Sequence, residues 1–305
     1  MLAQAGLISD LRDTVAALPD RCTGLNTRYT MTDIALSAFS VFFPQNPSFL
    51  EFQRTMGKNS GRQNAASLFG VRDVPSDNHI RSVLDEVPAA ALNGMFDRIR
   101  ERLDSTGELE RFRSINGDVL VTLDGTQYFR SERIRCPQCD TIHHSNGRVS
   151  YKHMLLSPAI VKAGRKDVTA LAPEFIHGDD GSGKAKNEIS AGKRWLRREP
   201  ERLSLLSVTI TGDDLYAAQP SLEQVRHAEM NSLCSCKPES HKYVTTYVER
   251  YRQSGETETL VTAEWTGKEH RTTTYEWIGT MAPLPMVTSL MGIDRSAPAG
   301  IFISI

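Results

Sequence analysis

The sequence has no long hydrophobic run, and this absence limits what the protein can be. No stretch of about 18 apolar residues occurs, so no membrane-spanning helix and no membrane partner are expected. The first residues, MLAQAGLISDLRDTV, contain Asp10 and Asp13 where a secretory signal would need an apolar core. The sequence therefore predicts a cytoplasmic protein.

The chain also lacks an excess of basic residues. It contains 36 Lys and Arg against 37 Asp and Glu, which leaves a formal net charge of −1. Strong nucleic-acid binders are usually basic, because neutralising phosphates releases condensed counterions. Any role in DNA binding must therefore depend on local clusters of charge. Cysteines are few as well, with five in the chain, and in the cytoplasm they favour metal binding or buried thiols over disulfides.

The spacing of apolar residues changes near residue 112. Before it, helical spacing predominates: Thr32 is a suitable N-cap for one helix, and Ser76 for another in which apolar residues recur at i, i+3, i+4 and i+7. After it, short apolar runs and alternating segments indicate strands. We therefore predict a helical region over residues 1–112 and a second domain over 113–305.

One segment of the helical region, residues 64–84 (NAASLFGVRDVPSDNHIRSVL), has the outline of a DNA-binding helix-turn-helix. Gly70 would lie in the turn, and the second helix would start at Ser76. Its exposed polar residues would be Asn78, His79, Arg81 and Ser82. Two packed helices that do not contact DNA fit the same pattern, so both interpretations stay open.

The second domain shows a definite order of elements. A strand ends at Asp124, a hairpin follows over 149–161 and 168–176, and helices at 185–198 and 222–228 alternate with strands at 203–211 and 230–234. Three antiparallel strands followed by helix-linked parallel strands form the RNase H-like mixed sheet, an α/β fold. The later segments TTYVERY, ETLVTAEW and HRTTTYEWI alternate polar and apolar residues, which predicts further antiparallel strands.

Aspartates stand at two strand ends that this topology places side by side. Asp124 ends the first strand and Asp213 ends the fourth. Carboxylates gathered in this way bind Mg²⁺ or Mn²⁺ in enzymes that cut phosphodiesters. Each residue also has a simpler interpretation, because Asp-Gly is a common turn and Asp213-Asp214 is compatible with a helix N-terminus.

A Cys-x-x-Cys motif lies in an insertion over about residues 130–150. Cys136 and Cys139 can bind a tetrahedral Zn²⁺ from one turn, and His143 and His144 are the expected further ligands of a structural site. Adjacent histidines diverge unless the backbone is irregular, so the possible substitutes are His153, Cys234 and Cys236. Buried thiols or a redox pair are the alternatives.

Basic residues gather on the helix expected at 185–198, and two more follow the last parallel strand. We predict DNA contacts from these residues: Lys184, Lys186, Lys193, Arg194, Arg197, Lys237 and His241. An ordinary solvated helix surface is the alternative explanation.

Several motifs together resemble the bacterial insertion-sequence transposases of the DDE type, in the ISNCY group. They are LVTLDGTQYF, the Cys-x-x-Cys with His-His, SYKHMLLSPAIV, LAPEFI and KNE…KRWL, with MTDIALSAFSVFFPQNPSFLEFQR and PSDNHIRSVLD nearer the N-terminus. The resemblance covers about residues 1–280. It implies an enzyme that binds terminal inverted repeats and joins them to target DNA, acting as a homodimer in a synaptic complex.

The resemblance also implies which carboxylates act. Asp124 matches the family's first aspartate and Asp213 its second, while Asp214 stands where the family has glycine. The family's third carboxylate is a glutamate on a helix beyond the fifth strand, and nothing after Cys236 matches that segment. Glu264, Glu269 and Glu276 lie in strand-like segments and are expected to face solvent. We therefore expect a chain truncated at its C-terminus, with impaired transposition, or else an inactive remnant that only binds DNA.

Overall fold

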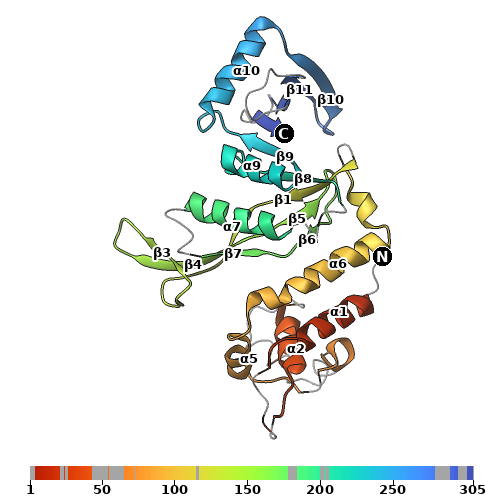
Figure 1. The fold of residues 1–305 in the computed structure, drawn as a ribbon, viewed down its shortest axis with the longest axis vertical. Helices are drawn as coiled ribbons and strands as arrows, with labels where there is room; N and C mark the ends of the chain where they lie inside the picture. The colour runs from red at the N-terminus through yellow and green to blue at the C-terminus, as the bar shows by residue number, and fades with distance from the viewer. Residues whose placement is uncertain are drawn as a thin grey trace. The chain divides into compact units, whose positions relative to one another are not determined.

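The computed structural model divides the chain into two compact units, Met1–Glu108 and Leu109–Ile305. The residues that it describes are 4–20, 24, 27–42, 54, 65–71, 73–114, 117–177, 184–199, 203, 206–278, 289–294 and 301–304. The fold is of mixed α/β type, as the sequence predicts, with helices in the first unit and two sheets in the second (Figure 1).

The first unit is built from helices around an apolar core. Its elements are α1 (Gln4–Ala16), α2 (Met31–Phe42), η1 (Ala65–Phe69), α5 (Asp77–Leu84), η2 (Ala89–Leu92) and α6 (Asn93–Ser105). The core includes Val15, Leu36 and Val71, each at most 3% exposed. Helix α2 begins earlier than the predicted cap at Thr32, because Thr30 and Asp33 form a reciprocal capping pair: the Thr30 backbone N–H donates to Asp33 (3.0 Å) and the Asp33 N–H donates to the Thr30 hydroxyl (3.1 Å).

The segment expected to form a helix-turn-helix contains one full helix among its described residues. Element η1 is a five-residue π-helical turn, and α5 begins after Ser76, whose hydroxyl accepts from the His79 N–H at 3.4 Å as predicted. His79 and Ser82 line a cavity of about 600 Å³ within this unit. The DNA-reading role of α5 therefore stays a prediction.

The larger sheet of the second unit has the strand order β10-β11-β12-β13-β9-β8-β1-β5-β6. At its centre are β6 (Thr169–Ala170), β5 (Ala159–Val161), β1 (Val119–Thr122), β8 (Val208–Gly212) and β9 (Asn231–Cys236). Strand β1 is antiparallel to β5 and parallel to β8, and β8 is parallel to β9. The carboxyl ends of β1, β8 and β9 therefore meet at one edge of the sheet.

The predicted hairpin is present, but each of its strands is interrupted. Ser157 and Pro158 separate β4 (Val149–Leu156) from β5, and Leu171 to Pro173 separate β6 from β7 (Glu174–Ile176). As a result β5 and β6 join the larger sheet, whereas β4 and β7 belong to a smaller one. The smaller sheet also contains β2 (Gly125–Ser131) and β3 (Asp140–His143), which the sequence patterns did not predict.

Two helices, α7 (Lys184–Arg198) and α9 (Gln219–His227), connect the central strands and lie side by side in Figure 1. The Gln224 side chain of α9 donates to the Lys193 carbonyl of α7 at 3.0 Å. Helix α7 is held against the segment between β6 and β7 by Trp195, which is fully buried and donates its indole N–H to the Ala172 carbonyl at 3.0 Å. The same helix also contributes Glu188, which lies beside Gly125, the first residue of β2.

The chain after β9 differs from the prediction in one element. The segment containing TTYVERY is a helix, α10 (Lys242–Ser254), rather than a strand, and it ends at Gly255 with a left-handed backbone (φ 74°). Strands β10 (Glu258–Trp265) and β11 (His270–Ile278) are as predicted, and β12 (Ser289–Asp294) and β13 (Ile301–Ser304) follow. Among the described residues, no helix has the length and apolar character needed to cross a membrane.

Candidate functional site

Asp124 and Asp213 lie at one edge of the larger sheet. Asp213 directly follows β8, and Asp124 lies two residues after the end of β1. These two strands are parallel neighbours, and Thr122 of β1 pairs with Thr211 of β8. The register continues one residue farther, because the Leu123 N–H donates to the Thr211 carbonyl at 2.9 Å. Both aspartates are exposed and line the same open cavity of about 500 Å³, together with Leu233 and Ser235 of β9. The two residues predicted to act together are therefore brought together.

Asp213 and its neighbour Asp214 have different surroundings. Asp213 is exposed, and its Oδ1 accepts from the Leu215 N–H at 2.9 Å in the turn after β8. The Asp214 carboxylate is half-buried and accepts from the Lys237 N–H at 2.5 Å, with the His241 imidazole 3.2 Å away. Asp214 thus ties the end of β8 to the end of β9, while Asp213 lines the cavity.

A buried carboxylate, that of Glu188 in α7, lies close to the two aspartate-bearing strand ends. It is 6% exposed, and its Oε1 accepts from the Tyr216 hydroxyl at 3.3 Å. A Cβ atom on Gly125, the residue after Asp124, would overlap both oxygens of this carboxylate. A Cβ on Gly212, the residue before Asp213, would lie 2.8 Å from Tyr216 Cβ. Both glycines are therefore required by close packing against Glu188 and Tyr216.

The pKa of Tyr216 reflects the closeness of these acidic groups. Burial raises the pKa of the Tyr216 hydroxyl far above its usual range, and the negative charges of Glu188, Asp213 and Asp124 raise it further. The sequence interpretation did not single out Glu188. Its one signal was its place in the KNE…KRWL motif, and nothing local indicates that it would be buried against Gly125.

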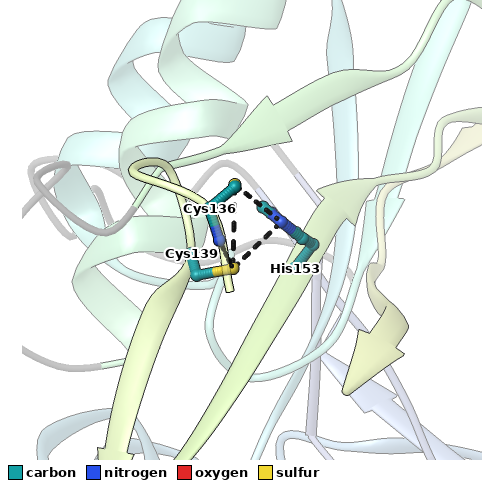
Figure 2. A group of neighbouring side chains, drawn as sticks. All are labelled: Cys136, Cys139 and His153. Carbon is teal, nitrogen blue, oxygen red and sulfur yellow. Dashed lines mark hydrogen bonds between the residues drawn. The ribbon is translucent and has the colours of Figure 1, made fainter. Parts of the chain in front are cut away.

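A second cluster of potential metal ligands lies in the smaller sheet (Figure 2). Cys136 and Cys139 come from the loop between β2 and β3, and His153 comes from β4. The His153 Nε2 lies 3.3 Å from Cys136 Sγ and 3.2 Å from Cys139 Sγ, and the two sulfurs are 3.7 Å apart. These three residues could hold a metal ion.

The histidines expected in this cluster are directed elsewhere. His144 Nε2 lies 2.8 Å from the Ser150 hydroxyl, and His143 is exposed at the end of β3. The structure therefore replaces the expected pair by His153, because the antiparallel pairing of β2 and β4 brings that residue, opposite Phe129, beside the Cys-x-x-Cys loop.

The other proposed thiol ligands lie in β9. Cys234 and Cys236 are at most 1% exposed, and burial raises the pKa of each thiol to about 12. In the part of the chain that the structure describes, neither belongs to a metal-ligating group. They are buried thiols of the larger sheet.

The predicted DNA-contacting residues have mixed surroundings. Arg194 is held by β7, since its Nε donates to the Glu174 carboxylate at 2.7 Å and its Nη2 to the Phe175 carbonyl at 2.8 Å. Arg197 and Lys237 are exposed, and Lys193 is half-buried. The side chains of Lys184 and Lys186 lie outside the described residues, and His241 is paired with Asp214.

The glutamates that follow β9 also differ from one another. Glu264 and Glu269 are exposed, as expected. Glu276 is not solvent-facing: it is 5% exposed, and the Arg252 Nε of α10 donates to it at 2.9 Å. The expectation for Glu276 was wrong because it treated α10, which supplies the arginine, as a strand.

Comparisons with known proteins give little further information. No family model and no curated protein matches the sequence. A cryo-EM structure of the piggyBac transposase synaptic complex with hairpin DNA is similar to 98% of this chain, at 16% sequence identity and a TM-score of 0.38. The chain spans 58% of the length of that transposase. A TM-score at this level does not establish a common fold.

Proposed function

We propose that this chain is a DNA transposase of the DDE type, with its catalytic centre at the edge where β1 and β8 end. The observation that carries the proposal is the placement of Asp124 and Asp213 at adjacent ends of parallel strands, in one open cavity. The order β6-β5-β1-β8-β9, antiparallel in its first three strands and parallel in the others, supports an RNase H-like arrangement. The insertion-sequence motifs described above point to the same class of enzyme.

The donor set at this edge suits a hard divalent cation, because carboxylate oxygens are the ligands that Mg²⁺ and Mn²⁺ prefer. Asp124 and Asp213 would hold such an ion. When bound, it would polarise the phosphodiester and stabilise the charge that develops on it. Asp213 is the aspartate of its pair that is available for this role, since the Asp214 carboxylate is occupied by Lys237 and His241.

Glu188 has a positioning role in this proposal. Its carboxylate packs beneath Gly125 and accepts from the Tyr216 hydroxyl, and Tyr216 in turn packs against Gly212. The two glycines are the immediate neighbours of Asp124 and Asp213. The buried pair of Glu188 and Tyr216 thus fixes the backbone next to both aspartates. This keeps the two aspartates close to each other before any substrate binds.

DNA would approach this edge from the open side of the cavity. Lys237 is exposed and follows β9, two residues beyond the cavity-lining Ser235, and Arg197 is exposed on α7. Both are suited to contact phosphate oxygens. Terminal inverted repeats and target DNA are the expected substrates, and a homodimer would bring two ends together.

Strand transfer tests the proposal. The purified chain is incubated with duplexes that carry the two ends of the encoding DNA element, in Mg²⁺ or Mn²⁺, and joined products are separated by size. In line with the impaired transposition expected from the sequence, we expect weak joining by the wild type. Joining should be lost in Asp213→Asn and should stay close to the wild-type level in the matched variant Asp214→Asn. Equal joining by Asp213→Asn and wild type would overturn the assignment.

Two other outcomes identify different functions. Binding of the end duplexes without cleavage by the wild type indicates a remnant that only binds DNA. This outcome is favoured by the fact that nothing after Cys236 matches the family segment that carries the third glutamate. Metal-dependent cleavage of unrelated duplexes, with no preference for the ends, indicates a nuclease of another purpose.

A further inference from the structure

We infer that Cys136, Cys139 and His153 bind one Zn²⁺ ion, which fastens the loop after β2 to strand β4. This inference is independent of the proposed DNA chemistry, because its ligands lie in the smaller sheet. The sulfurs are 3.7 Å apart, and the imidazole Nε2 is 3.3 and 3.2 Å from them. A tetrahedral zinc ion, with bonds of about 2.3 Å to sulfur and about 2.0 Å to nitrogen, sets these separations at about 3.8 and about 3.6 Å. The three donor atoms already lie within a few tenths of an ångström of that arrangement.

The local chemistry favours a thiolate site over a disulfide. Both cysteines are free, and their sulfurs are much farther apart than the about 2.05 Å of a disulfide bond. The Cys136 N–H donates to the Cys139 sulfur at 3.2 Å, and the Cys139 N–H donates to the Cys136 carbonyl at 3.1 Å. The turn thereby holds both sulfurs on one side, with a backbone donor directed at one of them. Two thiolates and an imidazole are a donor set typical of zinc.

The imidazole is held in place by its neighbours. His153 lies opposite Phe129 in the pairing of β4 with β2. Its ring stacks on Tyr128, with centroids 5.8 Å apart and planes 18° apart, and also contacts Phe129 at 5.5 Å. Figure 2 shows the His153 Nε2 directed toward the two sulfurs. The contacts with Tyr128 and Phe129 hold the ring in this orientation. A ligand fixed before the metal binds loses little conformational entropy on binding.

The described part of the chain supplies three ligands for the ion. No further His, Cys, Asp or Glu among the described residues lies within reach of the three ligands, and Cys136 is exposed. His144 is directed to Ser150 instead. A zinc ion would stabilise this loop, which has little apolar packing: Ile134, its large apolar residue, is 67% exposed. The loop has little apolar packing of its own to keep it on β4.

Metal analysis of the purified full-length protein tests this assignment without any DNA assay. We expect about one zinc per chain in the wild type, and metal at background level in the variants Cys139→Ser and His153→Ala. The matched controls are His143→Ala and His144→Ala, which remove the two histidines that stand outside the cluster and should keep the full zinc content. Far-ultraviolet circular dichroism of each variant reports whether it is folded.

Cobalt substitution in the wild type keeps the test decisive even if a variant fails to fold. Co²⁺ bound by two thiolates and one imidazole gives a sulfur-to-cobalt charge-transfer band and the visible bands of a tetrahedral site. Absence of both bands in the folded protein would overturn the inference. Zinc retained by folded His153→Ala but lost from His143→Ala or His144→Ala would overturn it equally, and so would a disulfide between Cys136 and Cys139 in protein purified without reductant. None of these results depends on transposition.

Discussion

Strand β1 has Asp118 directly before it and Asp124 two residues after its end, and the two aspartates have opposite surroundings. Asp118 is 5% exposed, and its Oδ2 accepts from the Thr209 hydroxyl at 2.6 Å and from the Asn231 amide at 2.9 Å. Asp124 is exposed and lines an open cavity with Asp213. The first carboxylate joins β1, β8 and β9 at their amino ends, whereas the second is available to a ligand. Two aspartates at the two ends of one strand therefore differ in role, and the groups that contact each side chain reveal the difference.

The largest effect on DNA joining is expected from replacing Asp124, the exposed aspartate after β1. Asp124→Asn removes a negative oxygen ligand and keeps the size of the side chain, so DNA joining should fall by on the order of a thousandfold or more. Thermal unfolding should be unchanged, because the Asp124 side chain is exposed. Rates of joining and melting curves, measured on the same preparations, check both parts. A variant that joins DNA normally would remove the contrast between the two aspartates.

Replacing Asp118, the buried aspartate before β1, should have the opposite result: stability should fall while joining persists. Asp118→Ala leaves the Thr209 hydroxyl and the Asn231 amide without their acceptor, so the free energy of unfolding should fall by about 3 kcal/mol. Joining at low temperature should persist in the folded fraction. Urea unfolding of the variant and the wild type measures the difference. Unchanged stability together with lost joining would mean that Asp118, and not Asp124, belongs to the site.

A smaller effect is expected from Gly125→Ala, which probes the packing beneath Asp124. The new Cβ would overlap the Glu188 carboxylate, so we expect a loss of about 2 kcal/mol in unfolding free energy and slower joining. Gly94→Ala is the matched control, since nothing lies within 4 Å of its Cβ position in α6. That substitution should leave the stability unchanged or raise it slightly.

A double variant separates steric overlap from other causes. Glu188→Ala removes the carboxylate that Gly125 contacts, so adding Gly125→Ala in that background should cost much less than it does in the wild type. Equal costs in the two backgrounds, compared by urea unfolding, would show that contact with Glu188 is not the reason for the glycine.

The two strand ends that carry the aspartates could be foreseen from the sequence, because each depends on short-range signals. An apolar run ending at Asp124 and another ending near Asp213 locate two strand ends, and a parallel pairing of those strands brings the ends together. The chemical roles of the two aspartates remain predictions. The capping residue Ser76 is equally local, and the structure agrees with it.

What the sequence did not reveal depends on long-range pairing. The choice of His153 over His143 or His144 follows from the register of β2 against β4, which contains an irregularity between Gln127 and Phe129. The burial of Glu188 depends on the packing of α7 against Gly125 and Tyr216, which lie far from it in the sequence. The misassigned helix α10 has tyrosines four residues apart, at 243, 247 and 251, a helical spacing that was hidden by the polar and apolar alternation of TTYVERY.

The smallest effect is expected in the reactivity of the cysteines, where buried and exposed thiols should again behave differently. Because burial raises the pKa of the Cys234 and Cys236 thiols to about 12, the reactive thiolate forms only at strongly alkaline pH. At pH 8 only about one such thiol in ten thousand is ionised, so alkylation of the folded protein should be very slow at these positions.

Cys136 is exposed and should be alkylated readily once a chelator is present. Mass spectrometry of peptides from iodoacetamide-treated protein, with and without chelator, measures each site. Rapid labelling of Cys234 in folded protein would show that β9 opens easily, and the edge formed by β1, β8 and β9 would then be too mobile to hold two aspartates in place.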